Sequence, residues 1–142
     1  MDPELKREII MENYTSPFNR ETVTDSRYIK VNSNNESCID NINIYLLIEE
    51  DIIKDIKFDG EACAISTSAT SIMNKLLLGK KIDEVLNIAT QYENMINELS
   101  YDSSILEEAN CFNEIYKQQN RKHCALLPWV GIKKALNNYK RQ

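Results

Sequence analysis

The spacing of the apolar residues changes near the middle of this sequence, and that change most constrains the fold. Apolar side chains alternate with other residues over 42–48, and alternate again over 52–58 after an acidic turn. A period of two indicates strands with one buried face, so these segments predict an antiparallel hairpin. Beyond Gly60 the apolar spacing becomes that of an amphipathic helix, which we expect to end at Gly79.

The rest of the pattern predicts one short strand and several helices. Ser104 and Glu107 have the spacing of a capping box, which favours a helix starting there. Pro128 is compatible with a helix only in its first turn, so we expect the last helix to open at Cys124. The expected strand covers 27–31, and the expected helices cover Pro3–Tyr14 (with Leu5, Ile9, Ile10 and Tyr14 on one stripe), 82–99, 104–116 and Cys124 onward.

These elements predict an α+β fold, with a small antiparallel sheet and helices packed on one face. A chain of 142 residues with 42% hydrophobic content has the size of one domain, so we expect a single domain over 1–142. No apolar run approaches the length of about 18 residues that spans a membrane, and the N-terminal segment is charged throughout. We therefore expect a cytoplasmic protein with no membrane partner.

Charge and cysteine content narrow the function classes. The formal net charge of −5 offers no broad basic surface for a phosphate backbone, so we expect no nucleic-acid partner. Four cysteines in a reducing cytoplasm favour free thiols or metal ligands over a disulfide framework.

Three of the four cysteines have polar or glycine-marked neighbours. Cys38 lies in an Asn/Ser-rich stretch that favours a loop, two residues before Asp40. Cys63 lies at the predicted junction of strand and helix, where free backbone N–H groups favour a thiolate. Cys124 follows His123, the only histidine in the chain. Thiolates, a carboxylate and an imidazole are donors that zinc or iron selects, so this set predicts a metal site.

Several motifs resemble those of the SufU/IscU family of iron–sulfur cluster assembly proteins. In chain order they are IIMENYTSPFNR, SCID, FDGEACAISTSATSIM, GK and RKHCALLPW, and they span nearly the whole sequence. The long interval between Cys63 and Cys124 resembles the SufU branch, as does the missing Leu-Pro-Pro-Val-Lys motif. His123 before Cys124 instead resembles the IscU pattern, and Ile39 replaces the glycine of the family's Cys-Gly-Asp motif.

The resemblance implies a small antiparallel sheet covered by helices and a metal held by Cys38, Asp40, Cys63 and Cys124. Zinc is the ion we expect from it, with iron or an iron–sulfur cluster as the alternative. His123 is an alternative to Asp40 as the fourth ligand. Either side chain can complete a tetrahedral shell.

The same resemblance implies two kinds of partner: a SufS-like cysteine desulfurase and downstream iron–sulfur assembly proteins. If the desulfurase displaced one ligand, the freed thiolate would attack the outer sulfur of the desulfurase persulfide. We expect Cys38 to be this acceptor, because it lies on the Asn/Ser-rich loop. The protein would then be a sulfurtransferase-like carrier, and whether that is enzymatic activity stays open.

Two other functions remain open at this point. One is a scaffold on which an iron–sulfur cluster is built with the same thiolates. The other is a zinc-stabilised interaction module without sulfur chemistry. A nucleophile and base pair of Cys124 and His123 is disfavoured, because sequence neighbours seldom point at each other.

Residues outside the ligand set receive plainer interpretations. Cys111 lies among apolar residues of a predicted helix, so we expect a core or half-buried thiol. Trp129 is expected in the core or as a hydrophobic anchor, in preference to a contact with a partner. Arg121 and Tyr14 match family positions near the site.

Overall fold

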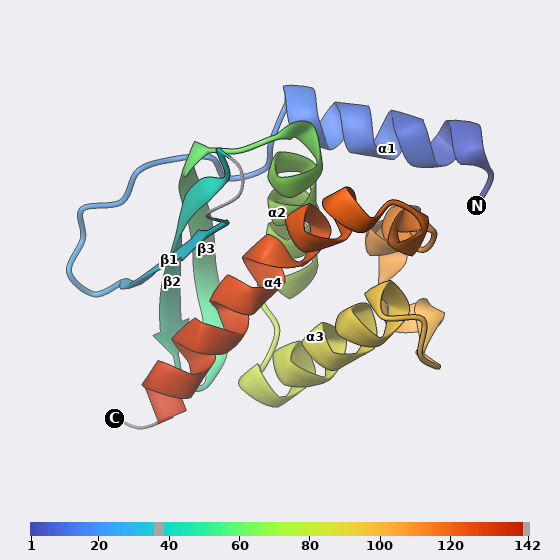
Figure 1. Cartoon of the computed structure of the whole chain (residues 1–142). Helices are drawn as coiled ribbons and strands as arrows, with labels where there is room; N and C mark the ends of the chain where they lie inside the picture. The colour runs from blue at the N-terminus through green and yellow to red at the C-terminus, as the bar shows by residue number, and fades with distance from the viewer. Residues whose placement is uncertain (36–38, 141–142) are drawn as a thin grey trace.

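The computed structural model of the chain describes residues 1–35 and 39–140. It confirms an α+β fold with a three-stranded antiparallel sheet and packed helices, and Figure 1 shows the arrangement. No helix in these two ranges has the length and apolar character needed to cross a bilayer. The elements in chain order are α1 (Pro3–Thr15), β1 (Ile29–Asn34), β2 (Asn41–Glu49), β3 (Ile52–Glu61), α2 (Ala64–Leu77), α3 (Ile82–Ile96), the short 3₁₀ segments η1 (Ser103–Ile105), η2 (Glu107–Phe112) and η3 (Ile115–Lys117), and α4 (Gln119–Lys140).

The sheet contains the predicted hairpin of β2 and β3, with β1 paired to the other side of β2. Glu50 and Asp51 connect the hairpin strands with φ angles of 55° and 59°. Two successive positive φ angles match the right-handed twist of the flanking strands. At the other end of the hairpin, Asn41 lies opposite Glu61. The residues just before β2 and just after β3 therefore leave the sheet at the same end.

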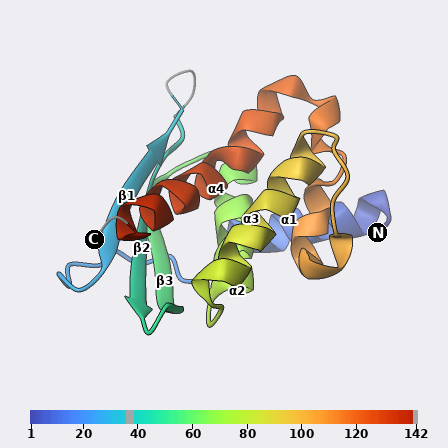
Figure 2. The same ribbon diagram turned by 90° about the horizontal axis from the view of Figure 1, so that it is seen from below.

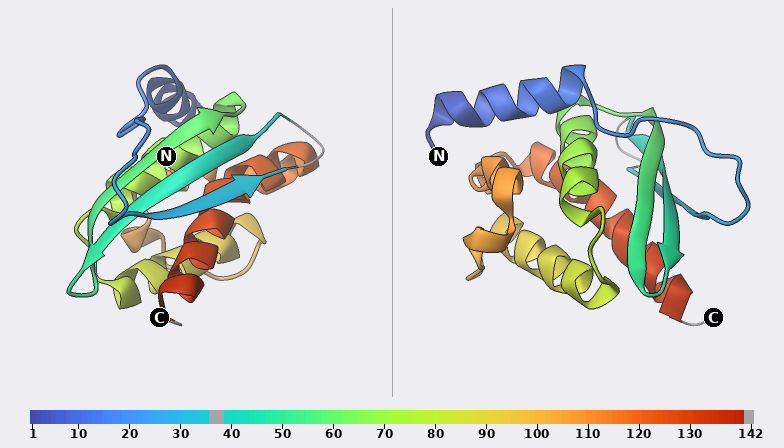
Figure 3. Two further views of the ribbon diagram at one scale, coloured as in Figure 1. Left: turned by 90° about the vertical axis from the view of Figure 1, so that its left-hand side faces the viewer. Right: turned by 180° about the vertical axis from the view of Figure 1, so that it is seen from behind.

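The helices lie on one side of the sheet, as Figures 2 and 3 show, which confirms the predicted layering. Helix α4 crosses β1 and β2 closely at Gly131. A Cβ atom at this glycine would lie 2.9 Å from Ile44 Cδ1 and 3.2 Å from Ser33 Cβ. The absence of a side chain there lets α4 approach the sheet. The opposite face of the sheet is polar, and Asp59 on it accepts hydrogen bonds from the side chains of Asn43 and Tyr45.

Aromatic side chains join the helices away from the sheet. Tyr92 of α3 stacks on Trp129 of α4 with ring centroids 4.5 Å apart, and meets Phe112 of η2 edge to face at 6.5 Å. All three rings are buried, which confirms Trp129 as a core residue. The Tyr92 hydroxyl donates a 2.8 Å hydrogen bond to the Ala125 carbonyl of α4, so the ring is both packed and satisfied.

The helix predicted over 104–116 is wrong. This region forms three short 3₁₀ segments instead of one α-helix. Glu107, the first residue of η2, has a φ of 45°, in the left-handed region, so one continuous right-handed helix cannot run through it. The capping box is also absent, because the carboxylate of Asp102 accepts the hydrogen bond from the Ser104 N–H.

The predicted start of the last helix is wrong as well. Helix α4 begins at Gln119, so Cys124 lies one turn inside it and Pro128 lies in its interior. Because proline has no N–H, the carbonyl of Cys124, four residues earlier, lacks its usual helical hydrogen bond.

Two other helices differ from the prediction in smaller ways. In α1 the expected apolar stripe is only partly buried, because Leu5 and Tyr14 are exposed. Asn13 takes a fully buried position on this helix instead, where it accepts a 2.7 Å hydrogen bond from the Ser71 hydroxyl of α2. Helix α3 ends at Ile96, three residues before the exposed Leu99.

Replacement of Gly60 should test the close contact between β3 and β2 at the end of the hairpin where Asn41 lies opposite Glu61. Its φ is 110°, and a Cβ there would lie 2.2 Å from the Asn41 carbonyl oxygen. We expect Gly60→Ala to lower the free energy of unfolding by about 3 kcal/mol or more, since strain and a steric clash add. Gly79 is the matched control, with φ 83° and nothing within 4 Å of its Cβ position. Gly79→Ala should cost only about 1–2 kcal/mol. Urea unfolding measures both values, and an equal loss of unfolding free energy in the two variants would contradict the close contact at Gly60.

The core position of Cys111 gives a second prediction. Burial raises the pKa of its thiol to about 12, and the charge of Glu108 adds to this effect. Because the thiolate is the reactive form, iodoacetamide at about pH 8 should modify Cys111 only after unfolding in urea. Peptide mass spectrometry would measure this, and rapid labelling of the folded protein would contradict it. Since the pKa is raised on folding, the associated stability is complete below about pH 8.5 and is lost as the pH rises toward about 12.

Candidate metal centre

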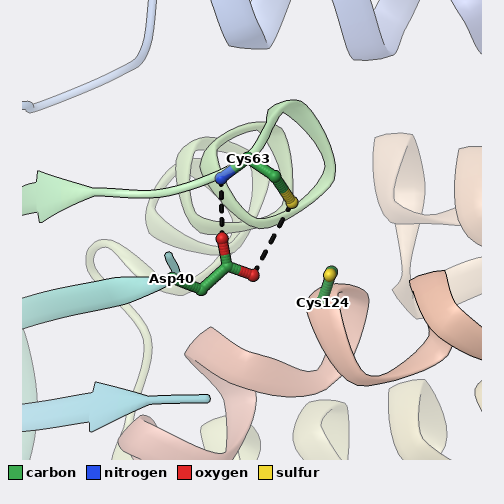
Figure 4. Close-up of side chains that lie close together, drawn as sticks. All are labelled: Asp40, Cys63 and Cys124. Atoms are coloured by element: carbon green, nitrogen blue, oxygen red, sulfur yellow. Dashed lines mark hydrogen bonds between the residues drawn. The ribbon is translucent and has the colours of Figure 1, made fainter. Parts of the chain in front are cut away.

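Asp40, Cys63 and Cys124 meet at one end of the sheet, although they come from three distant parts of the sequence. Their ligand atoms all lie within 4.8 Å of one another. Asp40 directly precedes β2, Cys63 directly precedes α2, and Cys124 lies near the start of α4. Figure 4 shows the carboxylate and the two sulfur atoms facing a common point. The hairpin register explains two of the three positions, because β2 starts where β3 ends.

The Asp40 carboxylate is held by the N-terminus of α2. It is 1% exposed, and its Oδ1 accepts a 2.7 Å hydrogen bond from the Cys63 N–H. Its Oδ2 accepts a 2.6 Å hydrogen bond from the Ser66 hydroxyl. A helix N-terminus presents unpaired N–H groups and a positive dipole end, which stabilise a buried carboxylate. These contacts fix the direction in which Asp40 presents its oxygens.

Cys63 is the N-cap of α2, in agreement with its predicted place at the junction of strand and helix. Its Sγ accepts a 3.5 Å hydrogen bond from the Ser66 N–H. The same sulfur lies 3.6 Å from Asp40 Oδ2 and 3.6 Å from Ser66 Oγ. A cysteine in this position uses its sulfur as Ser or Asp would use an oxygen in an N-cap.

Cys124 faces this pair from α4. It is 9% exposed, and its thiol contacts the carbonyl of Asn120 at 3.7 Å. Burial raises the pKa of the Cys124 thiol well above its ordinary range, and the neighbouring Cys63 and Asp40 groups raise it further. Three groups that become negative on ionisation thus lie together in a poorly hydrated place. A divalent cation is the partner that would stabilise all of them in ionised form.

The donor set and its spacing fit a zinc ion. Zinc binds thiolate sulfur at about 2.3 Å and carboxylate oxygen at about 2.1 Å, so two such tetrahedral ligands lie about 3.6 Å apart. The Cys63 sulfur and Asp40 Oδ2 are 3.6 Å apart. Sulfur and oxygen donors also suit iron, so this geometry agrees with both ions. Asp40, Cys63 and Cys124 would supply three of the four ligands of a tetrahedral shell.

The other predicted site residues have different outcomes. Cys38 lies outside the described residues. His123 is exposed and lines a surface groove with Asn35, Leu126 and Val130, and it is not part of the cluster of ligand atoms. Arg121 is also exposed.

Ser66 was missed as a functional residue by the sequence analysis. It lies three residues after Cys63, within the motif that carries the family resemblance, and it is fully buried beside two of the candidate ligands. Its position at N3 relative to an N-cap was a signal that could have indicated contact with the Cys63 side chain.

Comparison with known proteins confirms the family resemblance. The family model for the NifU-like N-terminal domain matches residues 5–142. The zinc-dependent sulfurtransferase SufU of Bacillus subtilis is 34% identical over 133 residues, which cover 93% of this chain and 89% of that protein. The iron–sulfur cluster assembly scaffold protein IscU of Thermotoga maritima is 29% identical over 134 residues, covering 94% of each chain.

Solved structures give the same result. A protein from Fervidobacterium islandicum, described as an iron–sulfur cluster assembly scaffold of the SUF system, superposes with a TM-score of 0.82 at 31% identity. The superposition covers 91% of this chain and 94% of that one. A NifU-like N-terminal protein from Brucella abortus shares the fold with a TM-score of 0.85 at 14% identity, over 95% and 94% of the two chains. Sequence match, fold and candidate ligands therefore agree that this chain belongs to the family of NifU-like N-terminal domains.

Proposed function

We propose that this protein is an iron–sulfur cluster assembly protein that binds zinc and accepts persulfide sulfur from a cysteine desulfurase. The observation that carries the proposal is the convergence of Asp40, Cys63 and Cys124 within 4.8 Å. The similarity to the Bacillus subtilis zinc-dependent sulfurtransferase over 93% of the chain supports the choice of zinc and of sulfur transfer. A cytoplasmic location belongs to the same proposal.

The proposed metal ligands are Cys38, Asp40, Cys63 and Cys124. When bound, zinc would keep its cysteine ligands deprotonated at neutral pH and would contribute folding free energy. The amide and hydroxyl of Ser66 hold Cys63 and Asp40 in place, so these two ligands are preorganised by the fold. Burial restricts the position of Cys124, which is almost fully shielded from solvent.

Cys38 is the proposed sulfur acceptor. Cys63 is engaged as the N-cap of α2, and Cys124 is 9% exposed inside α4, so neither sulfur is well placed to meet a large partner. Cys38 follows the Asn/Ser-rich stretch 32–37 of the sequence, a composition that favours a loop. It is therefore the ligand whose departure leaves the anchored residues Asp40, Cys63 and Cys124 in place.

The proposed transfer is a thiol exchange that conserves atoms and electrons. The Cys38 thiolate attacks the outer sulfur of the desulfurase cysteine persulfide, and a new S–S bond forms at Cys38. The original S–S bond breaks, and its electron pair leaves with the desulfurase cysteine as a thiolate. The proton on the outer sulfur stays with that sulfur. No oxidant or reductant is consumed, because one S–S bond replaces another. Downstream iron–sulfur assembly proteins are the proposed recipients of the sulfur.

A scaffold function is the second candidate. The Thermotoga maritima relative is named a scaffold protein for iron–sulfur cluster assembly, and thiolates are also the ligands of such clusters. In this case the cluster would be the cargo, built on Cys63, Cys124 and further donors. Anaerobic reconstitution with iron and sulfide that yields a stable coloured cluster would favour this function over sulfur transfer.

Metal analysis tests the proposed ligands. The purified protein should contain about one zinc ion per chain, and Asp40→Ala, Cys63→Ser and Cys124→Ser should each lower zinc affinity. Loss of residues that merely hydrogen-bond to metal ligands already costs about 10- to 100-fold, so loss of a ligand should cost at least about 100-fold. Chelation of the metal should also lower the melting temperature, because only the folded chain presents the site.

Cys111→Ser is the control for this experiment. Cys111 is buried in η2 and is absent from the cluster of candidate ligands, so its replacement should leave the zinc content unchanged. Unaltered zinc binding in the Cys63 and Cys124 variants would refute the metal site.

Sulfur acceptance is tested separately at Cys38. After incubation with a cysteine desulfurase and cysteine, intact and peptide mass spectrometry should find one added sulfur atom on Cys38. Cys38→Ala should abolish this adduct, whereas Cys111→Ser should keep it. An adduct formed at the same rate without Cys38 would contradict the assignment. A protein that binds zinc but never accelerates the desulfurase would instead be a zinc-stabilised interaction module.

A further inference from the structure

Ser66 connects all three elements of the candidate metal centre. Its hydroxyl oxygen lies 2.6 Å from Asp40 Oδ2 and 3.0 Å from the carbonyl oxygen of Cys124. Its backbone N–H donates to Cys63 Sγ at 3.5 Å. The side chain is fully buried, so water does not compete for these contacts. One residue thus contacts two candidate ligand side chains and the backbone of the third.

The contact with Cys124 exists because of Pro128. In an uninterrupted helix the carbonyl of Cys124 would accept the N–H of residue 128, but proline has none. An unpaired buried carbonyl is costly, and the Ser66 hydroxyl lies where it can supply the missing donor. A proline in the interior of α4 therefore creates an acceptor that points at α2.

A serine hydroxyl has one proton, and here it has two acceptors. When the proton goes to Asp40 Oδ2, the carboxylate is held against the N-terminus of α2. When Asp40 Oδ2 turns toward a cation, the same proton can go to the carbonyl of Cys124. In both arrangements the buried hydroxyl keeps a partner, so Asp40 can bind or leave a metal without a donor being stranded in the core.

We propose that Ser66 is the positioning residue of this metal centre: its hydroxyl orients Asp40 for the metal and ties the start of α2, where Cys63 lies, to Cys124 through the carbonyl that Pro128 leaves open. This inference rests on the proposed function, because it assumes that Asp40, Cys63 and Cys124 bind a metal. It adds a residue that is not itself a ligand and assigns a role to the proline inside α4. Figure 4 shows the three side chains whose relative placement depends on it.

Ser66→Ala tests the proposal, with Ser68→Ala as the matched control. Ser68 is equally buried in the same helix, but its hydroxyl donates only to its own helix, at 2.7 Å to the Ala64 carbonyl and 3.1 Å to that of Ile65. We expect Ser66→Ala to weaken zinc binding by about 10- to 100-fold, as loss of a group that orients a metal ligand does. Ser68→Ala should leave zinc affinity unchanged, even if both variants melt at lower temperature without metal.

The cobalt form supplies a readout that a purely structural role would not move. The visible spectrum of bound Co²⁺ depends on the number and geometry of its ligands. It should change in Ser66→Ala, where Asp40 loses its orientation, and should match that of the unsubstituted protein in Ser68→Ala. Equal zinc affinities and identical cobalt spectra for the two variants would overturn the role of Ser66. Failure of the unsubstituted protein to bind zinc or cobalt would instead overturn the proposed function.

Pro128→Ala tests the second half of the proposal. Alanine restores a helical N–H to the Cys124 carbonyl, which then depends less on Ser66. We therefore expect Ser66→Ala to reduce zinc affinity by a smaller factor in the Pro128→Ala protein than in the unsubstituted protein. The same fold loss in both backgrounds would overturn the role assigned to Pro128.

Discussion

The position of α4 depends on three buried hydroxyl groups that contact its backbone carbonyls. Tyr92 of α3 donates to the carbonyl of Ala125 and Ser33 of β1 to that of Leu127. The Ser66 hydroxyl of α2, whose one proton has Asp40 as its other acceptor, lies 3.0 Å from the carbonyl of Cys124. Each donor comes from a different element, and each acceptor lies in the turn that precedes Pro128. Because an unpaired buried polar group costs about 1–3 kcal/mol, a shift of α4 along its axis would break several of these contacts at once. The register of α4 against the rest of the domain is therefore well determined.

That register decides where the Cys124 sulfur lies. The other two candidate ligands are placed independently, by the hairpin and by the start of α2. Asn41 lies opposite Glu61, so the chain leaves both strands at one end of the sheet, with Asp40 before one and Cys63 after the other. Helices and strands thus position these three donors.

Local patterns predicted much of this fold, and their failures have identifiable causes. Alternation over 42–48 and 52–58 indicated the hairpin correctly, because one face of the sheet is buried and the other is solvated. The apolar spacing over 104–116 indicated a helix, yet Glu107 adopts a positive φ there and the chain forms 3₁₀ turns. Pro128 indicated a helix that opens at Cys124 with the proline in its first turn, since the hydrogen bond lost to a proline deeper in a helix is normally uncompensated. A hydroxyl from α2 compensates for it here.

The sequence by itself determined the types of donor and the local setting of Cys63, because residue chemistry and helix capping act over a few neighbouring positions. Its motifs also determined the family. Only the tertiary structure decided that Cys124 lies inside a helix and faces Cys63, and that Ser66 joins them. These contacts link residues far apart in the chain, 58 positions in the case of Ser66 and Cys124. They depend on how helices pack on the sheet, and no local pattern of side chains encodes such packing.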